Sequence, residues 1–492
     1  MVIVFTLVAL LVVAVLVTAN WYVWRRLFRD TTRGPGPVRR VGAVLIAGGW
    51  ALTVAALVAE RGGAPFWLQQ VLAWPGFLWL ALSIYLVLAV LAGDVVRPLL
   101  RWFLERRASG TAAALRQTRP EPETVMAGAT AHPQGRERRP VAAATGPQPG
   151  ATAVDSRPEP GSVAALDGEP EPGSVAAPDG PEAGPAPESD RRTAPAPPEP
   201  RPDPAPGTPA SGPSGPVGPT RRLFVSRVVA GAAAAAAVGT VGYGTYGVLS
   251  GPRVKRVTVP LARLPRGAHG YRIAVVSDIH LGPVLGRGFA QKVVDTINAT
   301  QPDLIAVVGD LVDGSVKDLG PAAAPLAQLR ARHGAYFVTG NHEYFSGAEQ
   351  WVEEVRRLGL RPLENARTEL PHFDLAGVND VAGEEEGQGP DFAQALGDRD
   401  RARACVLLAH QPVQIHEAVE HGVDLQLSGH THGGQLWPGN LIASAANPTL
   451  AGLERYGDTQ LYVSRGAGAW GPPTRVGAPS DITVIELASG QA

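Results

Sequence analysis

Three long apolar runs near the amino terminus place the strongest constraint on how this chain folds. They contain almost no charge and span about residues 2–24, 41–59 and 71–93. A helix needs roughly 20 predominantly apolar residues to cross a bilayer, so each run predicts a membrane-spanning helix. Tryptophans, whose amphipathic rings favour the membrane interface, lie near the ends of these runs: Trp21, Trp24, Trp67 and Trp74. The first run has no evident cleavage site, which favours an uncleaved helix over a signal peptide.

Arginines flank the apolar runs unevenly and predict their orientation. Six lie between the first and second runs: Arg25, Arg26, Arg29, Arg33, Arg39 and Arg40. Four follow the third run: Arg97, Arg101, Arg106 and Arg107. Cytoplasmic loops retain positive charge, whereas the connection at 60–65 is short and nearly neutral. Both arginine stretches are therefore expected in the cytoplasm, and the amino terminus outside.

Composition then divides the rest of the chain. Residues 108–219 contain no Phe, Trp, Tyr or Ile and are rich in Ala, Pro, Gly and Glu. Such a segment cannot bury enough apolar surface to offset its chain entropy, so it predicts a disordered linker. The expected organisation is a membrane domain over 1–107, the linker over 108–219, a further apolar segment over 220–250 and a separate folded domain over 251–492.

The segment 220–250 has two interpretations. Arg221 and Arg222 precede a run that carries no charge from Val228 to Ser250, which predicts a fourth membrane helix. The segment also resembles a twin-arginine export signal, although such signals usually begin a protein. Arginines acting as cytoplasmic anchors are the favoured interpretation. Either one places residues 251–492 outside the cytoplasmic membrane.

The region from 272 to 428 repeats one pattern, in which a short apolar run of strand type leads directly into polar residues of metal-binding type. The five runs and the residues that follow them are RIAVVS with Asp278 and His280, LIAVVG with Asp310 and Asp313, AYFVTG with Asn341 and His342, CVLLA with His410, and LQLSG with His430 and His432. Helical candidates separate them at about 288–300, 321–333, 348–359 and 413–421. Parallel strands joined by helices place their carboxyl ends at one edge, so the five tips are expected to converge.

These residues resemble the calcineurin-like metallophosphoesterases, whose ordered motifs appear here as SDIH, GDLVD, GNHE, AHQP and GHTH. The longer form GHTHGGQ, at 429–435, is similar to the membrane-tethered or exported bacterial branch. The resemblance covers about residues 254–488. It implies an α/β catalytic domain, a β-sandwich flanked by helices, which the apolar runs would attach to a multi-pass α-helical membrane anchor.

The resemblance also implies a site for two divalent metal ions with a bridging hydroxide. Carried over position by position, Asp278, His280 and His432 would hold the first ion, Asn341, His410 and His430 the second, and Asp310 would bridge both. Oxygen and imidazole ligands without thiolates suit Mn, Fe or Zn. The positive charge of two such ions exceeds the negative charge of the two carboxylates, Asp278 and Asp310, and one hydroxide. A net positive site would therefore remain for an anionic phosphate.

Three neighbouring residues receive other roles. In the family, the residue matching His342 contacts phosphate and protonates the leaving group, which a histidine can do at ordinary pH. Asp313 is expected to support the surrounding loop. Glu343 is expected either to orient His342 or to cap the following helix. The glycines Gly309, Gly340 and Gly429 precede ligand positions, where close backbone approach favours glycine.

The sequence therefore predicts a membrane-tethered phosphoric ester hydrolase, with a phosphodiesterase as the expected type. Its partners would be the lipid bilayer and a phosphoester, such as one derived from the cell envelope. Trp437 and Trp470 lie in segments (433–439 and 469–479) that are candidates for the substrate-selecting rim. A catalytically silent scaffold or binding module and a nuclease of the same superfamily are the alternatives. Net charge is −1 and residues 251–492 carry no basic patch, so no nucleic-acid partner is expected.

Overall fold

The computed structural model describes residues 2–117 and 220–490, so the predicted linker lies outside the described residues from position 118 to 219. The apolar runs form long helices: α1 Val2–Trp24, α2 Pro37–Arg61, α3 Phe66–Gln117 and α4 Arg221–Leu249. A short helical turn, η1 Arg25–Arg29, extends α1. All four are long and apolar enough to cross a membrane. Helix α3 continues past residue 107, where the linker was expected to begin, through an alanine-rich stretch that favours helix.

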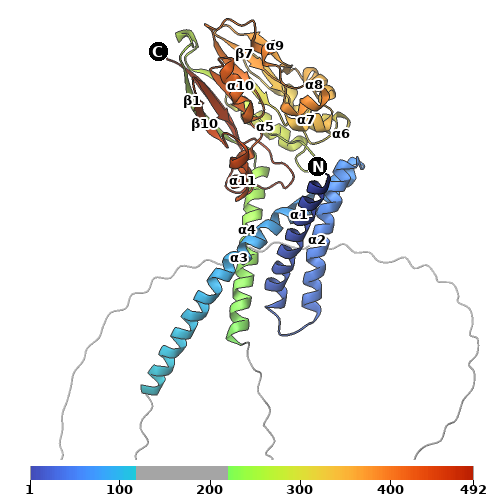
Figure 1. Ribbon diagram of the computed structural model, residues 1–492, viewed down its shortest axis with the longest axis vertical. Helices are drawn as coiled ribbons and strands as arrows, with labels where there is room; N and C mark the ends of the chain where they lie inside the picture. The colour runs from blue at the N-terminus through green and yellow to red at the C-terminus, as the bar shows by residue number, and fades with distance from the viewer. Residues whose placement is uncertain (1, 118–219, 491–492) are drawn as a thin grey trace, which may run out of the picture. The chain divides into compact units, whose positions relative to one another are not determined.

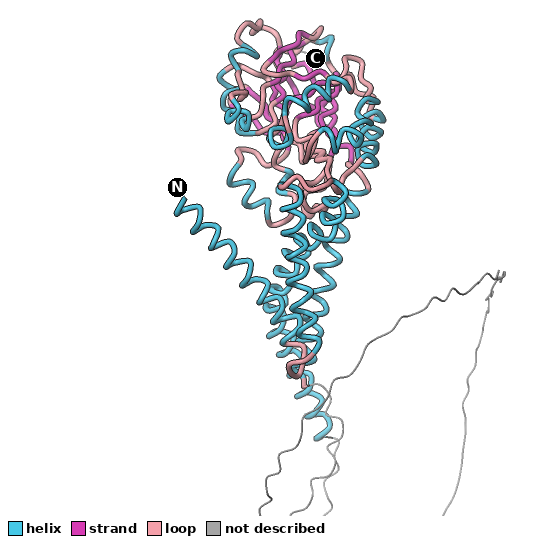
Figure 2. The backbone as a smooth tube through the Cα atoms, turned by 90° about the vertical axis from the view of Figure 1, so that its right-hand side faces the viewer, coloured by secondary structure: helices cyan, strands magenta, loops and turns pink. Residues whose placement is uncertain are grey.

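Figures 1 and 2 show the course of these long helices, and small residues lie at contacts between them. Helix α3 packs against both α2 and α4. At Gly49 of α2, a Cβ atom would lie 2.1 Å from the ring of Trp79 on α3. A larger residue there would push the two helices apart. Small residues that let helices approach closely are a common basis of packing in membranes, where lipid removes the hydrophobic driving force between helices.

The region after α4 is built on two six-stranded sheets (Figure 1). The first has the order β1-β12-β2-β3-β4-β5, and its strands are β1 Arg253–Leu261, β12 Asp481–Ser489, β2 Tyr271–Val276, β3 Leu304–Val308, β4 Ala335–Val338 and β5 Arg361–Pro362. The second has the order β10-β11-β9-β8-β7-β6, and its strands are β10 Gly452–Tyr456, β11 Thr459–Val463, β9 Leu425–Ser428, β8 Ala404–Leu408, β7 Phe373–Gly377 and β6 Ala366–Glu369. Both sheets mix parallel and antiparallel pairs.

Apolar side chains from both sheets form one shared core. Ile273 and Ala306 of the first sheet lie in a single buried cluster with Leu375 and Val406 of the second. Helices cover the two outer faces, and they are α5 Arg287–Ala299, α6 Val316–Ala323 and α8 Ala348–Arg357 on the first sheet, and α9 Phe392–Leu396 and α10 Ile415–Glu420 on the second. The α/β architecture expected from the resemblance is therefore confirmed, with mixed sheets.

The five predicted strands and three of the four predicted helices are present, and two details differ from the prediction. The helix expected over 321–333 is replaced by α6, which ends at Ala323, and a 3₁₀ turn, η3 Ala324–Gln328. Pro325, at the start of that turn, has no backbone N–H for a continuous helix. The five strand tips also belong to two sheets: β2, β3 and β4 run parallel in the first, and β8 and β9 run parallel in the second.

Loops that follow the last strand tips contact the membrane helices. Tyr85 of α3 donates a hydrogen bond from its hydroxyl to the Trp437 carbonyl at 2.9 Å. The hydroxyls of Thr245 on α4 and Thr474 lie 2.7 Å apart. Leu436 and Val476 pack against an apolar cluster formed by the membrane helices. The loops that were expected to form the substrate rim thus rest on α3 and α4.

Candidate metal centre

The turns that end the strands hold an unusual backbone conformation. Among the described residues, eight non-glycine residues have positive φ, and five of them are predicted metal ligands: Asp278, His280, Asp310, His430 and His432, with φ between 49° and 71°. L-residues other than Asn and Asp rarely adopt this region, and each such residue costs free energy. Strain of this kind clusters at functional sites, where the surrounding structure holds it in place.

Glycines make room for these turns, as expected from the sequence. A Cβ atom at Gly340 would lie 2.3 Å from Oδ1 of Asp310, and one at Gly429 would lie 2.5 Å from Oδ2 of Asp278. Gly309 combines a φ of +71° with a Cβ position only 2.5 Å from Nδ1 of His410. Any side chain at these three positions would displace a predicted ligand.

The structure brings Asp278, His280, Asp310 and His432 together as one group able to hold a metal ion. His280 Nε2 lies 3.0 Å from His432 Nε2 and 3.7 Å from Oδ2 of Asp310. His432 Nε2 also lies 3.4 Å from Oδ1 of Asp278. These residues come from three strand tips, those of β2, β3 and β9, so the group joins the edges of the two sheets.

A second group contains Asp310, His410 and His430. His410 Nε2 lies 3.2 Å from Oδ2 of Asp310, and His430 Nδ1 lies 3.0 Å from Oδ1 of Asn341. Asp310 therefore belongs to both groups, which is the position expected of a bridging carboxylate. All seven residues predicted as ligands meet at this junction of the two sheets.

The centre is buried and strongly charged. Burial raises the pKa of Asp278. Burial acts in the same direction on Asp310, but the facing His410 ring outweighs it and lowers the pKa of Asp310 well below its usual range. Burial lowers the pKa of His430 to about 4 and that of His432 well below its usual value, so both rings are neutral near pH 7. Neutral imidazole is the form that binds metal.

His410 provides the test of whether a cation fits. Its Nδ1 donates to the Val308 carbonyl at 2.9 Å, which leaves Nε2 facing the carboxylate of Asp310. That Nε2 is buried and, although it lies 3.2 Å from Oδ2 of Asp310, it makes no well-aligned hydrogen bond within residues 2–117 and 220–490. A poorly bonded buried polar atom costs free energy, and a divalent cation bound by both ring and carboxylate would reduce this cost. The donor set of oxygens and imidazole nitrogens also suits such an ion.

Asp313 positions two histidine rings. Its Oδ1 accepts from Nδ1 of His280 at 2.8 Å and from Nδ1 of His342 at 2.7 Å. Burial acts against a charged His342, but the hydrogen bond to Asp313 and the nearby carboxylates outweigh it and raise the pKa of His342 to about 9. The His342 side chain retains 15% exposure, so it lies at the open side of the centre. Exposed Phe345 and Trp470 flank its ring.

Glu343 holds the backbone of two turns and has no hydrogen bond to His342. Its carboxylate accepts from the amides of Asp310 at 2.9 Å, Leu311 at 2.8 Å and Gly340 at 2.6 Å. The contact to Gly340 caps the short helix α7 Asn341–Ser346, so the capping interpretation of Glu343 agrees with the geometry. The same side chain ties the tip of β3 to the tip of β4. Burial raises the pKa of Glu343 to about 7.

We expect Glu343→Gln to weaken metal binding while leaving the fold intact. The amide keeps the size of the carboxylate but turns one acceptor into a donor that would face a backbone N–H. Changes to residues that hold ligands typically cost about 10- to 100-fold in metal affinity or activity. Metal titration followed by calorimetry would measure this effect. Glu354→Gln, at a position remote from the centre on α8, is the matched control, and equal metal affinity in the two variants would contradict the role given to Glu343.

Sequence reasoning missed Arg475. This buried guanidinium donates to the carbonyls of His432 at 3.1 Å and Gly468 at 2.6 Å, and it lies 3.1 Å from Nδ1 of His432. Its backbone N–H reaches the Gly244 carbonyl of α4 at 3.4 Å. Arg475 therefore links a membrane helix to the metal centre. The flanking loop of Gly and Pro gives no periodic signal of burial, so nothing in its local pattern marks this arginine.

Comparison with known proteins gives a consistent result. A family model described as calcineurin-like phosphoesterase matches residues 271–434. A Danio rerio protein named as a transmembrane protein with metallophosphoesterase domain is 38% identical over 259 residues, which cover 49% of this chain and 59% of that protein. An uncharacterized metallophosphoesterase of Helicobacter pylori is 38% identical over 50% of this chain and 66% of its own length. This chain thus covers less than two thirds of either relative.

A third relative is matched over most of its length. It is an uncharacterized metallophosphoesterase of Aquifex aeolicus, 35% identical over 240 residues, which cover 48% of this chain and 91% of that protein. The similarity in all three cases extends over about half of this chain.

Proposed function

This chain belongs to the calcineurin-like metallophosphoesterase family, and we propose from that membership that it is a membrane-anchored, metal-dependent phosphodiesterase. The observation that carries the proposal is the burial of two carboxylates whose direct ion pairs within the described residues are all with histidine rings. These carboxylates belong to Asp278 and Asp310, which are 0% and 2% exposed. Buried carboxylates need positive charge nearby, and divalent ions would supply it.

The residues proposed to hold two divalent ions are those that the family resemblance implies, and the two groups around Asp310 support them. Asp278, His280 and His432 are proposed for one ion, Asn341, His410 and His430 for the other, and Asp310 for both. When bound, such ions supply Lewis acidity to phosphoryl oxygens and lower the pKa of bound water. The protein holds the donors just after packed strands, in turns and at the starts of short helices, which fixes their positions before substrate arrives.

His342 is proposed as the proton donor to the leaving group. Asp313 holds its Nδ1, so Nε2 is the nitrogen left for the substrate. The neighbouring carboxylates favour the charged ring, which is the form that can give a proton. Asp313 is then a positioning residue, since it acts through the rings of His280 and His342.

The proposed topology has four membrane spans and an extracytoplasmic catalytic domain. Its support is the distribution of arginines. The turn between α1 and α2, the later part of α3 and the start of α4 line one pocket together, so all three arginine-rich stretches lie at the same end of the helix bundle. Positive charge marks the cytoplasmic side. The opposite end of α4 leads into β1, which supports a catalytic domain on the other side.

The substrate we propose is a phosphodiester at the membrane surface. Exposed Phe345 and Trp470 flank His342, with 75% and 54% exposure. Trp437, 52% exposed, lies in the loop that Gln435 joins to Trp470 by hydrogen bonds. The loop that carries Trp437 rests on α3 through Tyr85. Amphipathic rings favour the interface, and an apolar rim would accept the second ester substituent that distinguishes a diester from a monoester.

The test is hydrolysis by the full chain in detergent, with bis-p-nitrophenyl phosphate and p-nitrophenyl phosphate as substrates. We expect turnover that depends on added Mn, Fe or Zn and that is faster for the diester. In His410→Ala, turnover should fall at limiting metal and recover partly in excess metal, because one ligand of several is lost. His416→Ala, an exposed histidine outside the centre, should match the wild type. Metal-independent turnover, or none with either ester, would contradict the proposal.

A further inference from the structure

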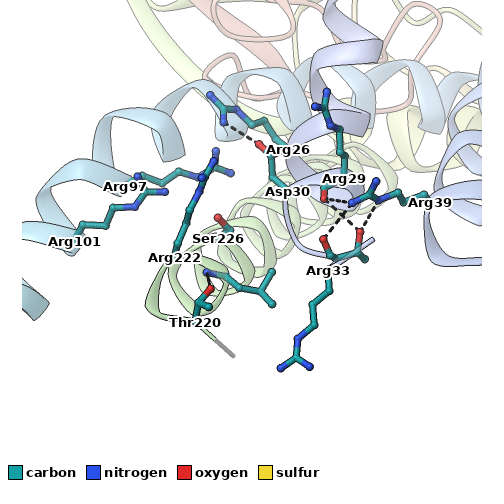
Figure 3. Close-up of a pocket in the computed structure, with 12 residues that line it drawn as sticks. Arg26, Arg29, Asp30, Arg33, Arg39, Arg97, Arg101, Thr220, Arg222 and Ser226 are labelled. Carbon is teal, nitrogen blue, oxygen red and sulfur yellow. Dashed lines mark hydrogen bonds and ion pairs between the residues drawn. The ribbon is translucent and has the colours of Figure 1, made fainter. Parts of the chain in front are cut away.

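A second candidate site lies at the arginine-rich end of the helix bundle (Figure 3). Helices α2, α3 and α4 and the turn after α1 contribute to a pocket of about 370 Å³. Seven of its twelve lining residues are arginines, from the turn after α1, the start of α2, the later part of α3 and the start of α4. Asp30 is the one acidic residue that lines it. None of these residues has a part in the phosphoesterase centre.

Some of the arginines are held by the protein itself. Arg26 pairs with Asp30 at 3.0 Å and also contacts Asp94, while Arg97 pairs with Asp94 at 2.7 Å. Arg39 donates to the hydroxyl of Thr32 at 2.8 Å and to nearby backbone carbonyls. These contacts hold the side chains of Arg26, Arg39 and Arg97 in place. The carboxylates of Asp30 and Asp94 and the loop carbonyls already accept hydrogen bonds from these arginines.

Two of the other lining arginines have no such partner among the described residues. Within the described parts of the chain, Arg101 and Arg222 have no ion pair or hydrogen bond from their side chains, and Nε of Arg101 is buried without a partner. Nε of Arg97 is likewise buried and unpartnered, on a side chain that is only 7% exposed. Arg97, Arg101 and Arg222 line the same pocket, and Figure 3 shows their side chains extending toward the same region of it. Like charges gathered in one pocket repel one another unless an anion lies between them.

The start of α4 adds a second attraction for anions. Thr220 caps this helix, and Leu223 and Ser226 of its first turns line the pocket. The 29-residue helix presents the positive end of its dipole there. Arg227 donates to the Thr31 carbonyl at 3.0 Å, which fixes the start of α4 against the turn after α1.

We propose that this arginine pocket binds a phosphate-bearing anion with two or more negative charges. Guanidinium groups match phosphate oxygens in pairs, and basic pockets between membrane helices are suited to phosphate headgroups. The volume lies within the range of small-ligand sites. Simple anchoring of the cytoplasmic face explains why arginines occur here, but it does not require that they converge on one pocket. Arg40 and Arg106 have the same charge and predicted side, yet do not line it.

The experiment uses the full chain in nanodiscs and two probes that carry the same chemistry. One probe is cardiolipin, incorporated into phosphatidylcholine nanodiscs and detected by native mass spectrometry. The other is pyrophosphate, titrated into protein in pure phosphatidylcholine nanodiscs. The variant is Arg101→Gln with Arg222→Gln, and the matched control is Arg40→Gln with Arg106→Gln. Cardiolipin binding would identify a lipid source, and pyrophosphate binding a soluble one.

We expect at least one probe to bind roughly tenfold or more weakly to the pocket variant and with nearly unchanged affinity to the control. Thermal stability without anion should not fall in the pocket variant, because like charges have been removed. Exposed Arg222→Gln alone provides the same comparison if the double variant fails to fold. Pyrophosphate held at the phosphoesterase centre would bind both variants equally. Binding of neither probe to the wild type, or equal loss in both variants, would overturn the proposal.

Discussion

Asp310→Asn should abolish most of the phosphoesterase activity and most of the metal binding together. Asp310 is the only carboxylate shared by both ligand groups, so its neutralisation weakens both proposed ions at once. The asparagine side chain has the same size and keeps the oxygen that accepts a hydrogen bond from the backbone N–H of His342 at 2.9 Å. A loss of several kcal/mol of transition-state stabilisation corresponds to a decrease in kcat on the order of 10³-fold. Excess metal should not restore it, in contrast to His410→Ala.

Metal content and thermal stability should be measured together with the rate of hydrolysis. A ligand present at about 100 times its Kd stabilises the folded state by roughly 2.7 kcal/mol, so Mn should raise the Tm of the wild type. It should raise the Tm of Asp310→Asn far less. Asp303→Asn is the control, since Asp303 lies just before the same strand and accepts a hydrogen bond from the Arg272 amide. A variant that retains both metal and turnover would remove Asp310 from the centre.

The positions of the predicted ligands could be derived from the sequence because each follows a short apolar strand. The structure places Asp278, Asp310, Asn341, His410 and His432 together, as the repeated pattern and the resemblance suggested. The pattern is informative because the carboxyl ends of parallel strands meet at one edge. It is a local signal, so it could not show that β8 and β9 belong to a different sheet from β2, β3 and β4.

Features that depend on contacts between distant segments could not be predicted from the sequence. Arg475 is buried beside His432 only because its loop folds back onto α4 and the tip of β9. Glu343 could be read as a capping residue, but its bonds to Asp310 and Leu311 depend on the approach of β3 and β4. The arginine pocket likewise requires knowing which ends of four helices meet. In each case the residue types were visible and their partners were not.

His342→Asn should separate proton transfer from metal binding. The asparagine amide can still donate to Asp313 from a position close to Nδ1, but it has no group to replace the proton donor Nε2. General acid catalysis typically contributes about 10²- to 10⁴-fold, so kcat should fall by that amount for a diester with a poor, alkoxide leaving group. The decrease should be much smaller for p-nitrophenolate, which leaves without a proton. Metal content should stay at the wild-type level, because no metal position is proposed for His342.

The dependence on leaving group makes this prediction specific to a proton donor. If His342 served only to bind the phosphate, both esters would lose the same factor, since the phosphoryl group is common to them. If it mainly supported the ring of His280, metal affinity would fall as well, because Asp313 joins the two rings. His372→Asn, at a histidine outside the centre, should leave both rates unchanged. Equal losses for the two leaving groups would therefore reject His342 as the acid and retain it as a phosphate ligand.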